Sequence, residues 1–529
     1  MAQSTDPVRQ PLLSGGDRPA ASHDGATAAA PGRRTFTPTM GAATAYGILV
    51  SIVIGSGVFT SPGAIDTNVP SPGMALVMWL LGGILAWAGA NTLAELGTAI
   101  PGEGGVQPYL QYIYGDVFGF LAAWTWVVAV MPATLAILSL VFVESIYSAL
   151  GNTDDAGSIT HKLLAVLVLV VMSLANSVST RASTRLSNFF LGTKFTSIVL
   201  IVAAGLAVVV LQMRDPERED VGGRDWFTKS WFGTRKTVNQ DGSTVDWDGM
   251  GAWEMLGHYS TAIYGALWAY SGWDKAIYVS SELKNPTKQL PLAINTAIPT
   301  IFVCFLVANA SYYILLPWKV VSTSDSVAVT AISRLLGVKF GIMSAVLICL
   351  VVAGSILGNS LVASRMVVSA ANKRWFPPVL AVIGRVGPAR KESDGDEGDG
   401  SSSSSDNDDP KKKTTTFDAP VNAIILSAVL TTLYIFFGNF RALLTFNGLG
   451  EYTFFFLTVV GAIALRFREP GLRRPYKPYL VVPIIFALVS GFVIARGAAF
   501  APVQALILVA LWVVGLGFYW ARQRWFTVG

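Results

Sequence analysis

Two stretches of this sequence place glycines and other small residues inside apolar runs, where freed backbone N–H and C=O groups could bind a polar ligand. They are residues 54–59, which read IGSGVF, and residues 268–274, which read WAYSGWD. Glycine weakens a helix by about 1 kcal/mol relative to alanine, and Asp274 places an acid within an apolar run. We therefore expect the helix to be unwound near the middle of each stretch.

An unwound helix in this position can bind a zwitterion. The first N–H groups of a half-helix attract a carboxylate, because they lack intrahelical acceptors and lie at the positive end of the helix dipole. The freed C=O groups of the other half-helix accept hydrogen bonds from an ammonium group. One break can therefore hold both ends of an α-amino acid. The alternative is close helix packing, which Gly-x-Gly also permits in membranes.

The composition excludes most soluble classes of protein. Hydrophobic residues make up 52% of the 529 residues and charged residues only 13%, about half the charged share of a soluble protein. The two cysteines, Cys304 and Cys349, lie in apolar runs and are too few for a disulfide scaffold, and three histidines add little to a metal site. We expect no metal, cofactor or nucleic acid, because basic loops at a membrane face explain the net charge of +5.

Twelve segments have the roughly 20 apolar residues that a bilayer crossing requires. The interrupted segments are the first and the sixth, so each begins a group of five. Because five is odd, the second group must run through the membrane opposite to the first, and breaks at matching positions of inverted halves indicate the central site of a transporter. The segments lie near residues 41–65, 73–98, 117–149, 161–179, 188–212, 257–281, 291–316, 340–371, 421–438, 443–465, 479–498 and 502–521.

The predicted fold is thus an all-α membrane protein with 12 transmembrane helices. Its membrane domain spans 40–522, with helices 1–5 and 6–10 as two repeats and helices 11 and 12 as additions. Residues 1–39 are expected to form a disordered tail, and 388–416 form an acidic, Ser-rich insert that cannot build a core. The insert is either a solvated linker or a phosphoregulated segment. Lys and Arg in the short loops favour a cytoplasmic location for both termini and for the insert.

Several motifs resemble the L-type amino acid transporter (LAT) family of the amino acid–polyamine–organocation (APC) superfamily, in its fungal branch. GSGVFTSPG at 55–63 looks like the first-helix signature of that family, and residues 268–291 are similar to its sixth helix and following loop. AELG at 94–97, ASR at 363–365 and RRPYKP at 473–478 also resemble it. The resemblance implies a LeuT-like fold of two inverted five-helix repeats plus two helices, and amino acid transport by alternating access.

The resemblance also implies a set of site residues. Trp268 occupies the place of the family's bulky aromatic gate, and Asp274 stands where many members carry Asn, so it is assigned with Lys194 to gating or coupling. The substrate carboxylate is expected to bind the backbone N–H groups of Ser56, Gly57 and Val58. The substrate amino group is expected to bind the backbone carbonyls of Ile54, Trp268, Ala269 and Ser271.

Lys194 is a charged residue inside the fifth segment, where an ammonium is costly unless it has a partner or water. In sodium-independent members of the family, a lysine at the matching position places its charge where sodium sits in sodium-coupled relatives. The resemblance therefore implies that Lys194 links segments one, five and eight, and that transport needs no sodium. The alternative is a lysine that snorkels to the cytoplasmic face. A polar stripe at 354–359 either faces Lys194 or packs helices, and Glu95 either relays protons or bonds a nearby arginine.

These features favour a secondary transporter of neutral L-amino acids, in particular large and methionine-like ones. They place it in the plasma membrane, or else in a vacuolar or other endomembrane. A sensor that binds without flux and a carrier of polyamines or cationic amino acids stay open as alternatives. Scattered histidines and the lack of a nucleotide loop argue against an enzyme or a primary pump. Animal members of the family pair with a glycoprotein through a cysteine between helices three and four. Residues 151–160 contain none, so no disulfide-linked heavy chain is expected.

Overall fold

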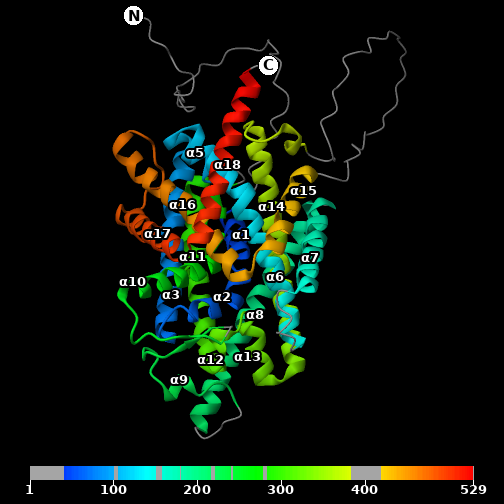
Figure 1. Ribbon diagram of the computed structural model, residues 1–529, viewed down its shortest axis with the longest axis vertical. Helices are drawn as coiled ribbons and strands as arrows, with labels where there is room; N and C mark the ends of the chain where they lie inside the picture. Colours follow the sequence, from blue (N-terminus) through cyan, green and yellow to red (C-terminus); the bar gives the residue numbers. More distant parts are fainter. Residues whose placement is uncertain are drawn as a thin grey trace, which may run out of the picture. The chain divides into compact units, whose positions relative to one another are not determined.

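The structure, a computed structural model, describes residues 41–100, 105–150, 158–178, 180–215, 221–239, 242–277, 283–382 and 419–527 (Figure 1). Within these ranges the regular elements are helices, apart from one antiparallel pair of two-residue strands. The predicted all-helical class is therefore confirmed. The tail predicted at 1–39 and the insert predicted at 388–416 lie outside the described residues.

The helices and strands are labelled as in Figure 1. The α-helices are α1 Ala42–Val53, α2 Gly57–Asp66, α3 Pro72–Ala99, α4 Gln107–Tyr114, α5 Asp116–Thr125, α6 Met131–Leu150, α7 Ile159–Val178, α8 Thr180–Arg214, α9 Asp225–Thr228, α10 Ala252–Ala269, α11 Pro286–Leu315, α12 Trp318–Thr323, α13 Val327–Leu336, α14 Val338–Asn372, α15 Val421–Phe437, α16 Phe440–Arg468, α17 Val481–Phe500 and α18 Pro502–Thr527. The other elements are the π-helix η2 Trp126–Val130, the 3₁₀-helices η4 Trp273–Ile277 and η6 Pro378–Ala381, and the strands β1 Thr237–Val238 and β2 Thr244–Val245.

Nine stretches of helix in the described part of the chain are long and apolar enough to cross a membrane. The three other predicted segments fall short for identifiable reasons. The first is split between α1 and α2. The sixth forms α10, which has 18 residues but is not apolar enough. The ninth forms α15, which has only 17 residues. The chain is therefore a multi-pass membrane protein, whereas the count of twelve crossings and the inverted repeat stay predictions.

Local sequence explains where several helices begin. Ser71 caps α3 by accepting a hydrogen bond from the N–H of Met74 at 3.3 Å, and Pro72 follows where its missing N–H costs nothing. Asn439 caps α16 in the same way, accepting from Ala442 at 2.9 Å. The third segment is less regular than expected, because the π-helix η2 separates α5 from α6. Such π turns occur frequently at functional sites.

The stretches between segments five and six and between segments seven and eight contain short elements that the apolar pattern did not predict. Figure 1 shows α9, α12 and α13 together at one end of the long helices. Of these, α12 and α13 pack against α2. At the C-terminal end of α2, Arg235 donates to both oxygens of the buried Asp66 at 2.6 Å, and Tyr313 donates to it at 2.7 Å. A Cβ added to Gly63 would lie 2.1 Å from the carbonyl oxygen of Ser324. Glycine at 63 therefore lets α2 pack against the turn between α12 and α13.

Glu95, near the end of α3, is held by two arginines. The Nε of Arg466 donates to one carboxylate oxygen at 3.0 Å and its Nη2 to the other, while the Nε of Arg474 lies 3.3 Å from the first oxygen. None of the three side chains is more than 7% exposed. These contacts support the interpretation of Glu95 as a structural acid. They also bring the AELG and RRPYKP motifs into direct contact.

Replacing Glu95 with alanine is expected to destabilise the protein by about 3–5 kcal/mol, because it leaves two buried guanidinium groups without their carboxylate. The measurement is the apparent melting temperature of the purified protein in detergent. Glu144→Ala is the control, since Glu144 is 21% exposed and lies 3.4 Å from a single partner, His161. If the Glu95→Ala and Glu144→Ala proteins melt at the same temperature, Glu95 does not stabilise the fold in this way.

Candidate functional site

The first break separates α1 from α2. The helix α1 ends at Val53, the chain bends through 54–56, and α2 begins at Gly57. The first backbone bond of α2 runs from the N–H of Phe59 to the C=O of Ser56 at 2.9 Å. The preceding N–H groups have no backbone acceptor within the described residues, as expected at a helix start. They belong to Ser56, Gly57 and Val58.

The second break separates α10 from η4. The helix α10 ends at Ala269, and the N–H of Ser271 donates to the C=O of Trp268 at 2.9 Å. Gly272 has a φ of +103°, a backbone conformation that glycine adopts without the steric cost that a Cβ adds. This glycine therefore allows the chain to turn from α10 into the 3₁₀-helix that begins at Trp273.

The two breaks lie in direct contact, and each is held against the other by a glycine. A Cβ added to Gly57 would lie 2.4 Å from the Cα of Ala269. A Cβ added to Gly272 would lie 2.7 Å from the Cγ2 of Ile52, at the end of α1. Residues more than 200 positions apart therefore meet backbone to backbone. Close helix packing and N–H groups without a backbone acceptor occur at the same place. The Gly-x-Gly sequence at 55–57 can therefore serve both close packing and ligand binding.

A cavity of about 30 Å³ lies between the two breaks, and we call it the break cavity. Its wall is completed by Thr134 and Leu138 of α6 and by α14. Four of the predicted site residues do not line the break cavity: Ile54, Val58, Lys194 and Asp274. Ile54 and Val58 are fully buried. Those that line it are Ser56, Gly57, Trp268, Ala269 and Ser271.

The break cavity offers polar groups that have no partner. The Oγ of Ser56 and the Nε1 of Trp268 are buried and form no hydrogen bond within the described part of the chain. Buried polar atoms are normally satisfied, so such atoms call for a water or a ligand. Because a water molecule needs roughly 10–15 Å³ of such space, the cavity has room for about two waters in this conformation. It must expand before it can hold an amino acid.

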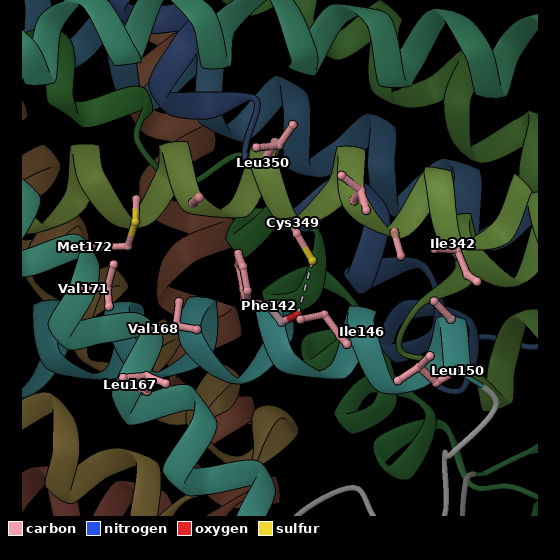
Figure 2. A pocket seen from close by; sticks show the side chains of 14 residues that line it. Phe142, Ile146, Leu150, Leu167, Val168, Val171, Met172, Ile342, Cys349 and Leu350 are labelled. Atoms are coloured by element: carbon pink, nitrogen blue, oxygen red, sulfur yellow. Dashed lines mark hydrogen bonds between the residues drawn. The ribbon is translucent and has the colours of Figure 1, made fainter. Parts of the chain in front are cut away.

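A larger hollow of about 530 Å³ lies between α6, α7 and α14. Figure 2 shows that its side chains carry only carbon and sulfur, with the Sγ of Cys349 donating to the carbonyl oxygen of Phe142 at 3.5 Å. Leu150 and Leu167 of this hollow are 63% and 57% exposed. An all-apolar wall gives no group for a carboxylate or an ammonium. The break cavity is therefore the candidate site, although it is the smaller of the two.

Lys194 lies deeper in its helix than predicted. The helix α8 begins at Thr180, not near residue 188, which places Lys194 14 residues, or about 21 Å, from the helix start. Its side chain is 1% exposed, and its Nζ lies 3.4 Å from the Oγ of Ser355 on α14. A Cβ added to Gly55 would lie 3.4 Å from the same Oγ. Ser355 thus connects Lys194 with the first break, and this burial does not fit a snorkelling lysine.

A second buried lysine, which the sequence analysis did not single out, contacts the same polar stripe. Lys275 of η4 lines the break cavity, is 3% exposed and donates from its Nζ to the Oδ1 of Asn359. Asn359 in turn donates to the C=O of Ser355 at 2.8 Å. Glu451 of α16 is another ionisable residue within the helices and is 5% exposed. Only the presence of charges inside apolar segments could have drawn attention to Lys275 and Glu451.

Comparison with known proteins identifies the family. A family model described as "Amino acid permease" matches residues 40–518. The chain belongs to this family. The match begins just before α1 and ends within α18, so it covers all of the membrane-spanning helices described above except the C-terminal end of α18. The permease therefore belongs to a family of transporters rather than of enzymes.

Two similar proteins place the permease among LAT-type transporters. The b(0,+)-type amino acid transporter 1 of Homo sapiens is 28% identical over 481 residues, which cover 91% of this chain and 87% of that protein. Large neutral amino acids transporter small subunit 2 of Mus musculus is 28% identical over 489 residues, which cover 92% and 82%. The resemblance to the LAT family of the APC superfamily is thereby confirmed, and general amino acid transport follows from it. The fungal branch stays a prediction.

Proposed function

We propose that this permease carries neutral L-amino acids, in particular large and methionine-like ones, across a membrane by alternating access and without sodium. The observation that supports this most strongly is the contact between two helix breaks around a cavity that presents free N–H groups. A half-helix start is a favourable place for a carboxylate. The breaks therefore offer N–H groups for the carboxylate of a zwitterion and carbonyl groups for its ammonium.

In this proposal the carboxylate of the substrate binds the N–H groups of Ser56, Gly57 and Val58. The amino group binds carbonyls of the two breaks, and Trp268 acts as the gate between the site and solvent. The cavity has room for water only, so the substrate enters when the α1–α2 and α10–η4 breaks move apart. The carbonyls are those of Ile54, Trp268, Ala269 and Ser271.

The lining of the break cavity favours neutral substrates. Its described residues include no Asp or Glu, and its one charged member is the cation Lys275. A cationic side chain would therefore meet repulsion with no compensating acid. Polyamines also lack the carboxylate that the start of α2 is suited to bind. A carrier of cationic amino acids or polyamines, the alternative of the same fold, is less well supported by these residues.

We further propose the topology that the sequence predicted. The chain crosses the membrane twelve times, with helices 1–5 and 6–10 as inverted repeats and both termini in the cytoplasm, and it works in the plasma membrane. Its two cysteines, Cys304 and Cys349, lie within α11 and α14. A disulfide-linked heavy chain is not part of this proposal.

Sodium independence is tested by uptake into proteoliposomes in matched sodium and choline buffers. The Nζ of the buried Lys194 lies 3.4 Å from the Oγ of Ser355, beside the first break, and in this proposal it takes the place of a sodium ion. Initial rates for L-leucine are therefore expected to be equal in the two buffers. Uptake that requires sodium would refute this role of Lys194. Saturable binding of L-leucine without any uptake would instead indicate a sensor.

A further inference from the structure

Part of the wall of the break cavity belongs to neither break. It comes from α6, η4 and α14, and we call it the side-chain wall: Thr134, Leu138, Lys275, Ser355 and Asn359. In the proposed binding mode the two breaks hold the carboxylate and the amino group of the substrate. The substrate's own side chain therefore lies against the side-chain wall, and the chemistry of that wall decides which amino acid fits.

Three polar residues of the side-chain wall already have partners in the protein. The Oγ1 of Thr134 donates to the Oδ1 of Asn447 at 3.4 Å, and the Oγ of Ser355 donates to a backbone carbonyl of its own helix at 3.1 Å. The amide of Asn359 donates to the C=O of Ser355 at 2.8 Å and accepts from Lys275. These hydroxyl and amide groups are therefore occupied within the protein and offer a substrate little.

Lys275 differs from them, because its ammonium group has donors left over. A lysine ammonium carries three N–H donors, and the Nζ of Lys275 has one hydrogen-bond partner within the described residues, the Oδ1 of Asn359. In the same part of the chain no carboxylate forms a salt bridge with it. Its side chain is only 3% exposed, and a buried charge with unfilled donors is costly. An acceptor inside the cavity that Lys275 lines would supply the missing bonds.

The α-carboxylate of a substrate does not distinguish one amino acid from another. Every amino acid brings this carboxylate, and in the proposed binding mode it is held by the N–H groups at the start of α2. A second acceptor, on the side chain of the substrate, is needed for the spare donors of Lys275. A hydrocarbon side chain would displace water from the cavity and leave these donors unfilled, which costs binding free energy. The side-chain wall therefore discriminates between side chains with and without an acceptor.

We propose that Lys275 is a specificity residue that favours neutral amino acids whose side chain carries a hydrogen-bond acceptor. This inference rests on the proposed function and narrows the substrate class of the same site. Glutamine fits best, because its carbonyl oxygen lies at the end of an unbranched side chain. Methionine has a weakly accepting sulfur in its side chain and is expected to rank next. Norleucine has an unbranched side chain of similar length without an acceptor, and it is expected to rank last.

The test compares L-glutamine with L-norleucine in proteoliposomes that contain the full-length protein. Initial uptake rates are measured with each radiolabelled amino acid at the same concentration, well below saturation. A site built to hydrogen-bond its substrate discriminates against an analogue that lacks the bonding group, so the wild type is expected to prefer glutamine by about tenfold or more. Lys275→Met keeps an unbranched side chain without donors and is expected to abolish this preference, mainly through slower uptake of glutamine.

Lys339→Met is the matched control, because Lys339 is exposed near the start of α14, and it is expected to keep the wild-type preference. Equal rates for the two amino acids in the wild type would overturn the inference and leave the transport function intact. An unchanged preference in Lys275→Met would also overturn it. If Lys275→Met does not transport, the ratio is measured as binding of the two amino acids to the purified variant, and as uptake by Lys275→Gln, whose amide keeps two donors without the charge. Lys275→Gln is expected to show a reduced preference, and the full wild-type preference would overturn the role of the ammonium. A wild type that carries no amino acid contradicts the transport function and the inference with it.

Discussion

Gly57→Val is expected to abolish amino acid uptake while the protein remains folded. Even the first carbon of a side chain at this position would lie 2.4 Å from the Cα and 2.9 Å from the Cβ of Ala269. The nearest atoms include backbone, so no rotamer change can relieve the clash, and the two breaks must separate. Since a displacement of about 1 Å can cost 100-fold in activity at a site that depends on geometry, we expect at least that loss in the initial rate of uptake.

A pair of alanine substitutions makes this result specific. Gly57→Ala introduces the same clash with the smallest side chain and is expected to reduce uptake strongly. Gly358→Ala is the control, because a Cβ at Gly358 in α14 would have no atom within 4 Å. Both proteins are expected to elute as the wild type does in size-exclusion chromatography. Uptake by Gly57→Ala at the rate of Gly358→Ala would contradict the assignment of the breaks as the binding site.

Lys194→Met is expected to cause the second large loss of amino acid uptake. The substitution keeps an unbranched chain but removes the ammonium, so the Oγ of Ser355 loses its charged neighbour beside the first break. Hydrogen bonds to charged groups contribute about 1.5–3 kcal/mol, which corresponds to roughly a 10- to 100-fold loss in the initial rate of uptake.

Lys229→Met is the matched control, because Lys229 is 61% exposed and pairs with Asp225 on the short helix α9. It is expected to transport at the wild-type rate. If Lys194→Met transports equally well, the ammonium has no part in coupling the first break to α8 and α14. The position would then be a packing site for an aliphatic chain.

The features of the fold that depend on neighbouring residues were predictable. The apolar runs located the membrane helices, and Gly55, Gly57 and Gly272 marked the two breaks because glycine acts on the backbone locally. The helix α8 was predicted too short, since hydropathy reports the apolar part of a helix and not its hydrogen bonding. The polar residues 180–187 extend it beyond the apolar run. The π-helix η2 has no marker in its sequence, WVVAV.

The features that could not be predicted from the sequence are contacts between distant segments. The stripe at 354–359 was recognised, but the two lysines that contact it come from α8 and η4, 161 and 84 residues away in sequence. Trp273 of η4 lies within 3.4 Å of the hydroxyl of Tyr452 on α16, although 179 residues separate them in sequence. Such convergence depends on tertiary packing, which helical periodicity in one segment does not encode. The residues of the breaks were therefore predictable, and the contacts of the two lysines with the polar stripe were not.

The central claim is that the paired breaks bind both charged ends of an amino acid and carry it across the membrane. The most direct measurement compares uptake into proteoliposomes of radiolabelled L-leucine, of 3-methylbutylamine, which lacks the carboxylate, and of 4-methylpentanoate, which lacks the amine. The account predicts saturable uptake of leucine alone, with neither analogue transported or able to compete at equal concentration. Uptake of the amine at the rate of leucine, or no uptake of leucine or any other amino acid by a folded protein, would contradict it.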